Sequence, residues 1–139
     1  MSLIAHFTTS RGPIRVRLHD EKAPLTVANF VGLAEGTKNY SKDGSAPRPG
    51  NGQPFYDGVV FHRVIEGFMA QGGDPTGTGM GGSKKPDLKA EFSAEPHTRG
   101  ACSMARSSNP NSANSQFFIV FDNASFLDKQ YTVWGRVTD

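Results

Sequence analysis

The sequence has one cysteine, little net charge and no long hydrophobic run, and each shortage excludes a class of protein. The 139 residues carry a formal net charge of +2, which indicates no nucleic-acid or anionic-membrane surface, since both need clustered basic residues. Cys102 stands alone, which excludes an internal disulfide and favours a reducing compartment. The longest apolar run, 117–121, is far too short to cross a membrane. Residues 1–12 show no signal-peptide pattern, so we expect a cytoplasmic protein without nucleic-acid or membrane partners.

Patterns of reactive or metal-binding residues are also missing. The four histidines lie far apart, without the spacing of metal ligands, and no serine sits in a nucleophile elbow. We expect Cys102 to be a buried hydrophobic side chain. Residues 77–82 repeat the glycine spacing of a dinucleotide-binding loop, but the prolines on either side leave no room for a helix to begin. We therefore predict a glycine loop there, no cofactor and no metal.

What the sequence does have is glycine, proline and phenylalanine. Sixteen glycines and nine prolines indicate a loop-rich β protein, and ten phenylalanines supply a core. Residues 3–9 and 14–18 have the pattern of a β-hairpin. Arg15 and Arg17 should face water, while Ile14, Val16 and Leu18 face a core. Short apolar segments follow at 59–65, 68–71, 101–105, 116–121 and 131–137.

One segment, about 24–35, has the pattern of a helix. Pro24 suits its first turn, and Gly36 suits its end. A single apolar stripe at helical spacing consists of Val27, Phe30, Val31 and Ala34. Residues 37–54 read as a surface loop. Together the patterns predict a mainly β fold, a closed or nearly closed antiparallel barrel capped by this helix, in a single domain of residues 1–139.

The first segment that indicates function is 61–74, Phe-His-Arg-Val-Ile-Glu-Gly-Phe-Met-Ala-Gln-Gly-Gly-Asp. In a strand, Arg63 shares a face with Phe61 and Ile65, where a charge needs a partner or a ligand. From this segment alone, a structural pair with a carboxylate and a functional arginine are equally open.

The second segment that indicates function is 115–121, Ser-Gln-Phe-Phe-Ile-Val-Phe. Alternation places Gln116 and Phe118 on one face of a strand and Phe117 and Ile119 on the other. A strand buried on both faces would explain the phenylalanines but not Gln116.

These segments, together with Ser-Met-Ala at 103–105 and Phe-Leu-Asp at 126–128, resemble the cyclophilins, the cyclosporin-binding family of peptidyl-prolyl isomerases. The resemblance covers essentially the whole chain, from the first hairpin to Val137, and 61–74 is its most specific part. The loop at 107–112 is similar to that of bacterial single-domain members. The resemblance implies a cyclophilin-like barrel and an enzyme that rotates X-Pro peptide bonds and assists protein folding. Its partners would be proline-containing peptides and unfolded or flexible protein segments.

The resemblance also implies a role for each matching residue. Arg63 matches the catalytic arginine. The apolar wall that receives the proline ring consists of Phe68, Met69, Phe118 and Leu127. Gln71 and Gln116 match polar groups that position Arg63 and the substrate backbone. Ala105 and Arg106 match a strand edge whose main chain pairs with the peptide, although family members often carry Asn at the second position.

Three departures from the family bear on function. Phe126 stands where the family has a tryptophan that affects cyclosporin affinity more than turnover, so we expect weak cyclosporin binding. Tyr131 stands where histidine is often found in the substrate pocket. Members usually continue past 131–137 with a helix and a strand that closes the barrel, whereas this chain stops at Asp139. We therefore expect a barrel truncated in its C-terminal part, which self-associates through the edge near 3–9.

The implied residues suit the implied reaction. Amide resonance opposes rotation with a barrier of about 18–20 kcal/mol, and no bond breaks, so neither a nucleophile nor a metal is needed. In the twisted state the proline nitrogen regains a lone pair, and a hydrogen-bond donor aimed at it lowers the barrier. Arginine stays protonated and holds its donors in a plane. We therefore predict a non-covalent mechanism with Arg63 as the donor. The same guanidinium could also hold the prolyl carbonyl, and the sequence does not separate these two roles.

Two other functions remain open from the sequence. A cyclophilin-like module could bind proline segments without useful turnover, and an isomerisation assay beside a peptide titration separates the two. A small nucleic-acid-binding barrel would need a basic groove with stacking aromatics, which the charge balance argues against.

Overall fold

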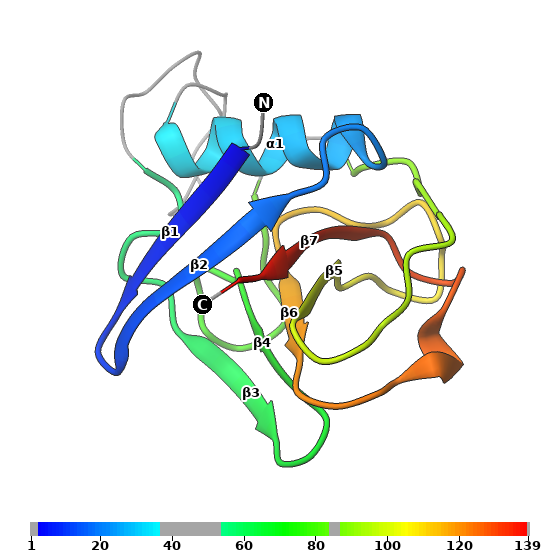
Figure 1. The fold of residues 1–139 in the computed structure, drawn as a ribbon. Coiled ribbons are helices and arrows are strands. Elements are labelled where there is room, and N and C mark those ends of the chain that lie inside the picture. The colour runs from blue at the N-terminus through cyan, green and yellow to red at the C-terminus, as the bar shows by residue number, and fades with distance from the viewer. Residues whose placement is uncertain (1–2, 37–53, 84–86, 139) are drawn as a thin grey trace.

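The computed structural model describes residues 3–36, 54–83 and 87–138, and it shows seven antiparallel strands in one curled sheet with a helix at one end (Figure 1). The elements are β1 (Leu3–Thr9), β2 (Gly12–Leu18), α1 (Pro24–Glu35), β3 (Phe61–Ile65), β4 (Met69–Gly72), β5 (Ala101–Met104), β6 (Phe117–Val120), η1 (Ser125–Leu127, a 3₁₀ turn) and β7 (Val133–Val137). Their order in the sheet is β1-β2-β7-β5-β6-β4-β3. The predicted mainly β, barrel-like fold is confirmed as a half-barrel, with β1 and β3 as the two edges.

The ends of α1 agree with the prediction from sequence. Pro24 opens the helix, and Gly36 closes it in the left-handed conformation with φ 76°. The first turn has no capping side chain of its own. Instead the Glu91 carboxylate accepts the backbone N–H groups of Leu25 and Thr26 at 3.0 and 2.7 Å. This carboxylate accepts hydrogen bonds from first-turn N–H groups that have no acceptor within the helix.

The sheet has an apolar cluster on each face. Alternate residues of β6 point to opposite faces, so Phe117 joins the cluster beneath α1, with Phe30 and Trp134, and Phe118 joins the other. The second cluster contains Met69, Ala101, Phe118, Val120, Ala124, Leu127 and Val133. The face away from α1 therefore carries most of the predicted apolar wall.

A β-bulge at His62 changes how β3 presents its side chains. Phe61 pairs with Gly72 and Arg63 with Gln71, so one residue of β3 has no counterpart on β4. Phe61 consequently packs into the cluster beneath α1, while Ile65 packs on the opposite face. The prediction that Arg63 shares a face with Ile65 agrees with the register, but the prediction that it shares a face with Phe61 is wrong.

Other expectations from the sequence can be checked against the described residues. Cys102 is fully buried, and burial raises the pKa of its thiol to about 12. Arg15 and Arg17 are exposed while Val16 and Leu18 are buried, as predicted for the hairpin. Most of the predicted surface loop, residues 37–53, lies outside the described residues. That residues 1–139 form a single domain stays a prediction.

Within the described ranges, no helix is long and apolar enough to cross a membrane. The same ranges contain no group of three or more His, Cys, Asp or Glu side chains that could hold a metal ion.

Candidate active site

The pairing of four strands places the main candidate residues in one row. Arg63 of β3 lies opposite Gln71 of β4, Gln71 lies opposite Phe118 of β6, and Phe118 lies opposite Ser103 of β5. Directly paired residues project from the same face of a sheet. The row therefore brings a cation, an amide and an aromatic ring to the face that carries the second apolar cluster.

Arg63 is exposed, and its guanidinium makes no hydrogen bond or ion pair with any other residue that the structure describes. The alternative of a structural Arg–carboxylate pair therefore finds no partner in this part of the chain. The five N–H donors of the group face solvent and are available to a ligand.

The predicted apolar wall is assembled beside this row. Met69, Phe118 and Leu127 are buried in the second cluster, and Phe68 is half-buried against it. Phe126 is 65% exposed, with its ring 5.7 Å from that of Phe68. The wall is thus an apolar surface with a projecting aromatic rim.

The two glutamines form a connected pair. Gln71 Nε2 donates to Gln116 Oε1 at 2.9 Å, and Gln116 Nε2 donates to the carbonyls of Gly79 and Gly81 at 3.0 and 2.8 Å. Gln116 is thereby fixed by both of its amide hydrogens. No hydrogen bond joins Gln71 to Arg63 in the described residues, although the two lie opposite each other in the pairing of β3 with β4.

Asp74 organises the glycine loop (residues 75–82) that holds Gln116. Its carboxylate is fully buried and accepts the backbone N–H groups of Thr76, Thr78, Gly79 and Gly81 at 2.6–3.1 Å. Burial raises the pKa of this carboxyl, but these N–H groups and the Thr76 hydroxyl outweigh it and hold the pKa far below its usual value. The carboxylate is therefore permanently ionised near neutral pH.

Gly81 of this loop has a steric explanation. A Cβ at Gly81 would lie 2.3 Å from Asp74 Oδ1, so a larger residue could not approach the carboxylate. Residues 75–82 form turns and bends, and no helix begins in the described residues that follow them, which agrees with the predicted glycine loop. Sequence reasoning missed Asp74, although an aspartate immediately before a Thr- and Gly-rich stretch is typical of a side chain that bonds the following N–H groups.

Arg106 and Tyr131 form a second rim of the site. The Arg106 guanidinium lies over the Tyr131 ring, 4.5 Å from its centroid, and donates to the carbonyls of Gln130 and Ser107. Tyr131 packs against the second cluster beside Ala105. The Ala105 N–H already donates to the Gln116 carbonyl at 3.0 Å. All eleven predicted site residues thus lie in or beside one region of the second face.

A cavity of about 910 Å³ lies elsewhere, lined by β1, α1 and residues 56–61. It contains none of the eleven predicted site residues. Its lining includes Phe117 and Phe30, so it opens on the face beneath α1.

Comparison with known proteins shows the family of the chain. Residues 4–139 match the family described as cyclophilin type peptidyl-prolyl cis-trans isomerase/CLD. The chain belongs to this family. A probable peptidyl-prolyl cis-trans isomerase A of Mycobacterium leprae is 48% identical over 145 residues, covering 94% of this chain and 71% of the relative. A probable peptidyl-prolyl cis-trans isomerase of Brucella suis is 59% identical over 137 residues, covering 91% and 61%.

Solved structures agree with the fold. A cyclophilin type peptidyl-prolyl cis-trans isomerase of Cryptosporidium parvum, determined in the presence of the dipeptide Ala-Pro, matches with a TM-score of 0.78 at 30% identity, covering 99% of this chain and 79% of that one. The cyclophilin AquaCyp293 of Hirschia baltica matches with a TM-score of 0.74 at 25% identity, covering 100% and 66%. These findings confirm the predicted family, the fold and the class of activity, a peptidyl-prolyl isomerase.

Proposed function

We propose that Arg63 catalyses rotation about X-Pro bonds as a hydrogen-bond donor to the twisted proline nitrogen. A planar amide nitrogen is a poor acceptor because its lone pair is delocalised, whereas a twisted one is basic. A donor at that atom consequently stabilises the transition state more than either planar isomer. The guanidinium of Arg63 has no partner among the described residues, which supports this role, since its donors need not first break an ion pair within that part of the chain.

The apolar wall holds the proline ring while the preceding carbonyl group swings. Phe118 and Met69 are each under 6% exposed and packed in place, so the ring meets a surface that does not have to reorganise. Covering Arg63 with substrate also removes water from around it, which strengthens its hydrogen bonds. Because no bond is made or broken, the chemistry needs no nucleophile.

The amide groups beside the wall orient the peptide backbone. Gln71 uses one amide hydrogen on Gln116 and keeps its carbonyl oxygen for an incoming N–H. Since the Ala105 N–H is already bonded, main-chain pairing with the peptide uses the Ala105 carbonyl and the Arg106 N–H. Backbone pairing of this kind accepts many sequences around the proline.

The observation that carries the proposal is the row of Arg63, Gln71 and Phe118 beside the apolar wall. Its test is exchange NMR on a peptide that contains one X-Pro bond, with a binding titration of the same peptide. We expect exchange between the cis and trans signals to speed up in proportion to protein concentration. Saturable binding without faster exchange would support the binding module in its place.

The binding partners and the cellular location of the chain are also proposals. We propose that the chain acts on flexible, proline-containing protein segments in the cytoplasm and that cyclosporin binds it weakly. Phe126 offers a ring at the rim but no indole N–H. We also propose self-association through the edge strand β1, where Leu3 and Ile4 are 44% and 41% exposed.

A further inference from the structure

His97 lies directly behind the apolar wall, although the sequence pattern did not single it out. Its side chain is fully buried. The ring stacks against Phe118 with 6.2 Å between centroids and 17° between planes, and it meets the Tyr131 ring edge-on at 6.4 Å. His97 therefore packs against one face of the Phe118 ring.

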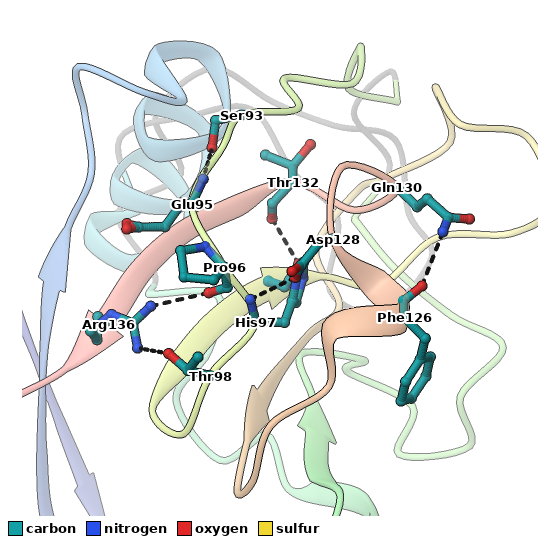
Figure 2. A network of polar contacts seen from close by, with 11 residues as sticks. Ser93, Glu95, Pro96, His97, Thr98, Phe126, Asp128, Gln130, Thr132 and Arg136 are labelled. Carbon is teal, nitrogen blue, oxygen red and sulfur yellow. Dashed lines mark hydrogen bonds and ion pairs between the residues drawn. The ribbon is translucent and has the colours of Figure 1, made fainter.

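His97 also holds both ends of the η1 turn, which carries Phe126 and Leu127. Its carbonyl accepts the Ala124 N–H at 2.8 Å, just before the turn. Its own N–H donates to Asp128 Oδ1 at 2.8 Å, and its ring Nδ1 lies 3.0 Å from the same oxygen, just after the turn (Figure 2). Three contacts to one residue thus fix the turn relative to β5 and β6.

The other ring nitrogen binds the sheet. His97 Nε2 lies 2.9 Å from Ser103 Oγ, which lies 3.0 Å from the Thr132 carbonyl. The Ser103 hydroxyl donates to that carbonyl, which also accepts the Met104 N–H at 3.0 Å, and the same hydroxyl oxygen contacts Nε2. The Asp128 carboxylate can only accept, so Nδ1 carries the hydrogen of the His97–Asp128 bond.

The charged groups around the ring agree with a neutral imidazole. Burial lowers the pKa of His97 more than the Asp128 carboxylate raises it, and Arg136 lowers it further. Arg136 extends from β7 to the Pro96 carbonyl and the Thr98 hydroxyl, on either side of His97 (Figure 2). Asp128 and Arg136 are the charged groups that act on this ring.

The order Asp128–His97–Ser103 has the contacts of a hydrolytic triad, but it cannot act as one. The Ser103 side chain is fully buried in β5, so no substrate carbonyl reaches its oxygen. The network therefore serves to hold structure in place.

We propose that His97 is a positioning residue for the apolar wall, setting Leu127 and the η1 turn against Phe118 through Asp128 and Ser103. The proposal rests on the proposed function of the wall. If the wall binds the proline ring and Arg63 acts separately, loosening this connection weakens substrate binding and leaves the rotation step largely intact. The expected signature is a rise in KM with little change in kcat.

The direct test compares three variants. Asp128→Ala removes the carboxylate acceptor of two His97 hydrogen bonds and should raise KM by about 5- to 10-fold, since the net contribution of each such bond is modest. Asp128→Asn keeps an oxygen acceptor and should stay within about 2-fold of the parent KM. Asp122→Ala is the matched control, because within the described ranges this exposed carboxylate bonds the neighbouring Asn123 N–H alone. An unchanged KM in a folded Asp128→Ala protein, or an equal rise in Asp128→Asn, overturns the proposal.

Two further readouts separate positioning from stability alone. The ring ¹⁵N signals of His97 should report the Nδ1–H tautomer in the parent protein and in Asp128→Asn, and should lose that preference in Asp128→Ala. Titration with a proline peptide gives Kd for every variant, so the comparison stands even if the parent proves to bind without turnover. A lower melting temperature with unchanged Kd would show a structural role only and would also overturn the proposal.

Discussion

At the scale of single residues, the side chains of the site differ in how firmly they are held. Gln116 donates both amide hydrogens to carbonyls of the glycine loop, and Phe118 is packed against His97 and Tyr131. Arg63, by contrast, is exposed and bonded to no other described residue. A donor that must follow a changing substrate has to be unpaired beforehand, while the groups that orient the substrate must be fixed. This contrast fits Arg63 as the group that acts and its neighbours as the groups that place the peptide.

The exposed ring of Phe126 gives a prediction about inhibition. Phe126→Trp adds an indole N–H and a larger ring at a position that is 65% exposed. We expect inhibition by cyclosporin to tighten by about 5-fold or more, the size of one added hydrogen bond with its apolar contact. Inhibition constants from the isomerisation assay measure this. Phe92→Trp, at an exposed phenylalanine outside the site, is the control, and equal inhibition of Phe126→Trp and the parent would refute the assigned role.

Residue types predicted much of the site but not its supporting contacts. Arg63, Gln71 and Phe118 were predicted from motif resemblance, and the strand register brings them into one row. His97 and Asp128 are 31 positions apart, and nothing in local spacing predicts that they bond. Such contacts follow from tertiary packing, which a single sequence does not show.

At the scale of elements, the sequence pattern predicted the strand and helix ends that depend on residues close together in the chain. The bounds of β1 and α1 agree with the sequence pattern, because a hairpin turn, a first-turn proline and a terminal glycine act within a few residues. The bulge at His62 was not predicted, since it depends on how β3 pairs with β4. The Glu91 carboxylate that caps α1 lies 65 residues away from Thr26, beyond any helix signal.

The glycine loop gives a prediction at this scale. Asp74→Asn replaces one carboxylate oxygen with an NH₂ group that must face backbone donors, whichever way the amide turns. The loop should detach from this side chain and release Gln116. We expect kcat/KM to fall by about 10-fold, measured with a proline peptide, and the Gln116 side-chain NMR signals to broaden. The exposed Asp122→Asn should match the parent, and a folded Asp74→Asn protein with parental kcat/KM would show that the loop does not support the site.

At the scale of the whole molecule, the two faces of the sheet have separate tasks. The cluster beneath α1 buries Phe30, Phe117 and Trp134, which is the large apolar area expected to stabilise the fold. The opposite face buries less and carries the row of site residues. Substitutions such as Arg63→Ala on the second face can therefore change activity without unfolding the chain.

Stability should depend on pH through two histidines. Burial lowers the pKa of both His97 and His19, so the unfolded chain binds protons more readily than the folded one below about pH 6.5. The free energy of unfolding should be nearly constant above pH 7 and should fall as the pH drops below 6.5, by at most about 1.4 kcal/mol per pH unit for each histidine. Urea unfolding from pH 5 to 8 measures this. His97→Gln should flatten the slope, and an unchanged slope would contradict the account of His97 as a neutral buried ring.

The open edge of the sheet predicts self-association. Among the strands that the structure describes, β1 pairs with β2 alone, and Ile4 is 41% exposed on it. Sedimentation should show association that grows with concentration, and Ile4→Lys should weaken it by placing a charge on the pairing edge. Leu25→Lys on α1 is the control at another exposed aliphatic residue. A chain that stays monomeric at every concentration would refute the proposal.

The central claim is that Arg63 accelerates rotation and not merely binding. The measurement is exchange NMR at saturating peptide for the parent, Arg63→Ala and Arg63→Lys, with Kd and melting temperature recorded on the same samples. The account predicts an exchange rate at least about 10-fold slower in Arg63→Ala, with Kd within about 3-fold of the parent and an unchanged melting temperature. Arg63→Lys should also be slow, because an ammonium does not reproduce the planar set of donors. A folded Arg63→Ala protein that exchanges the peptide at the parental rate would contradict the claim.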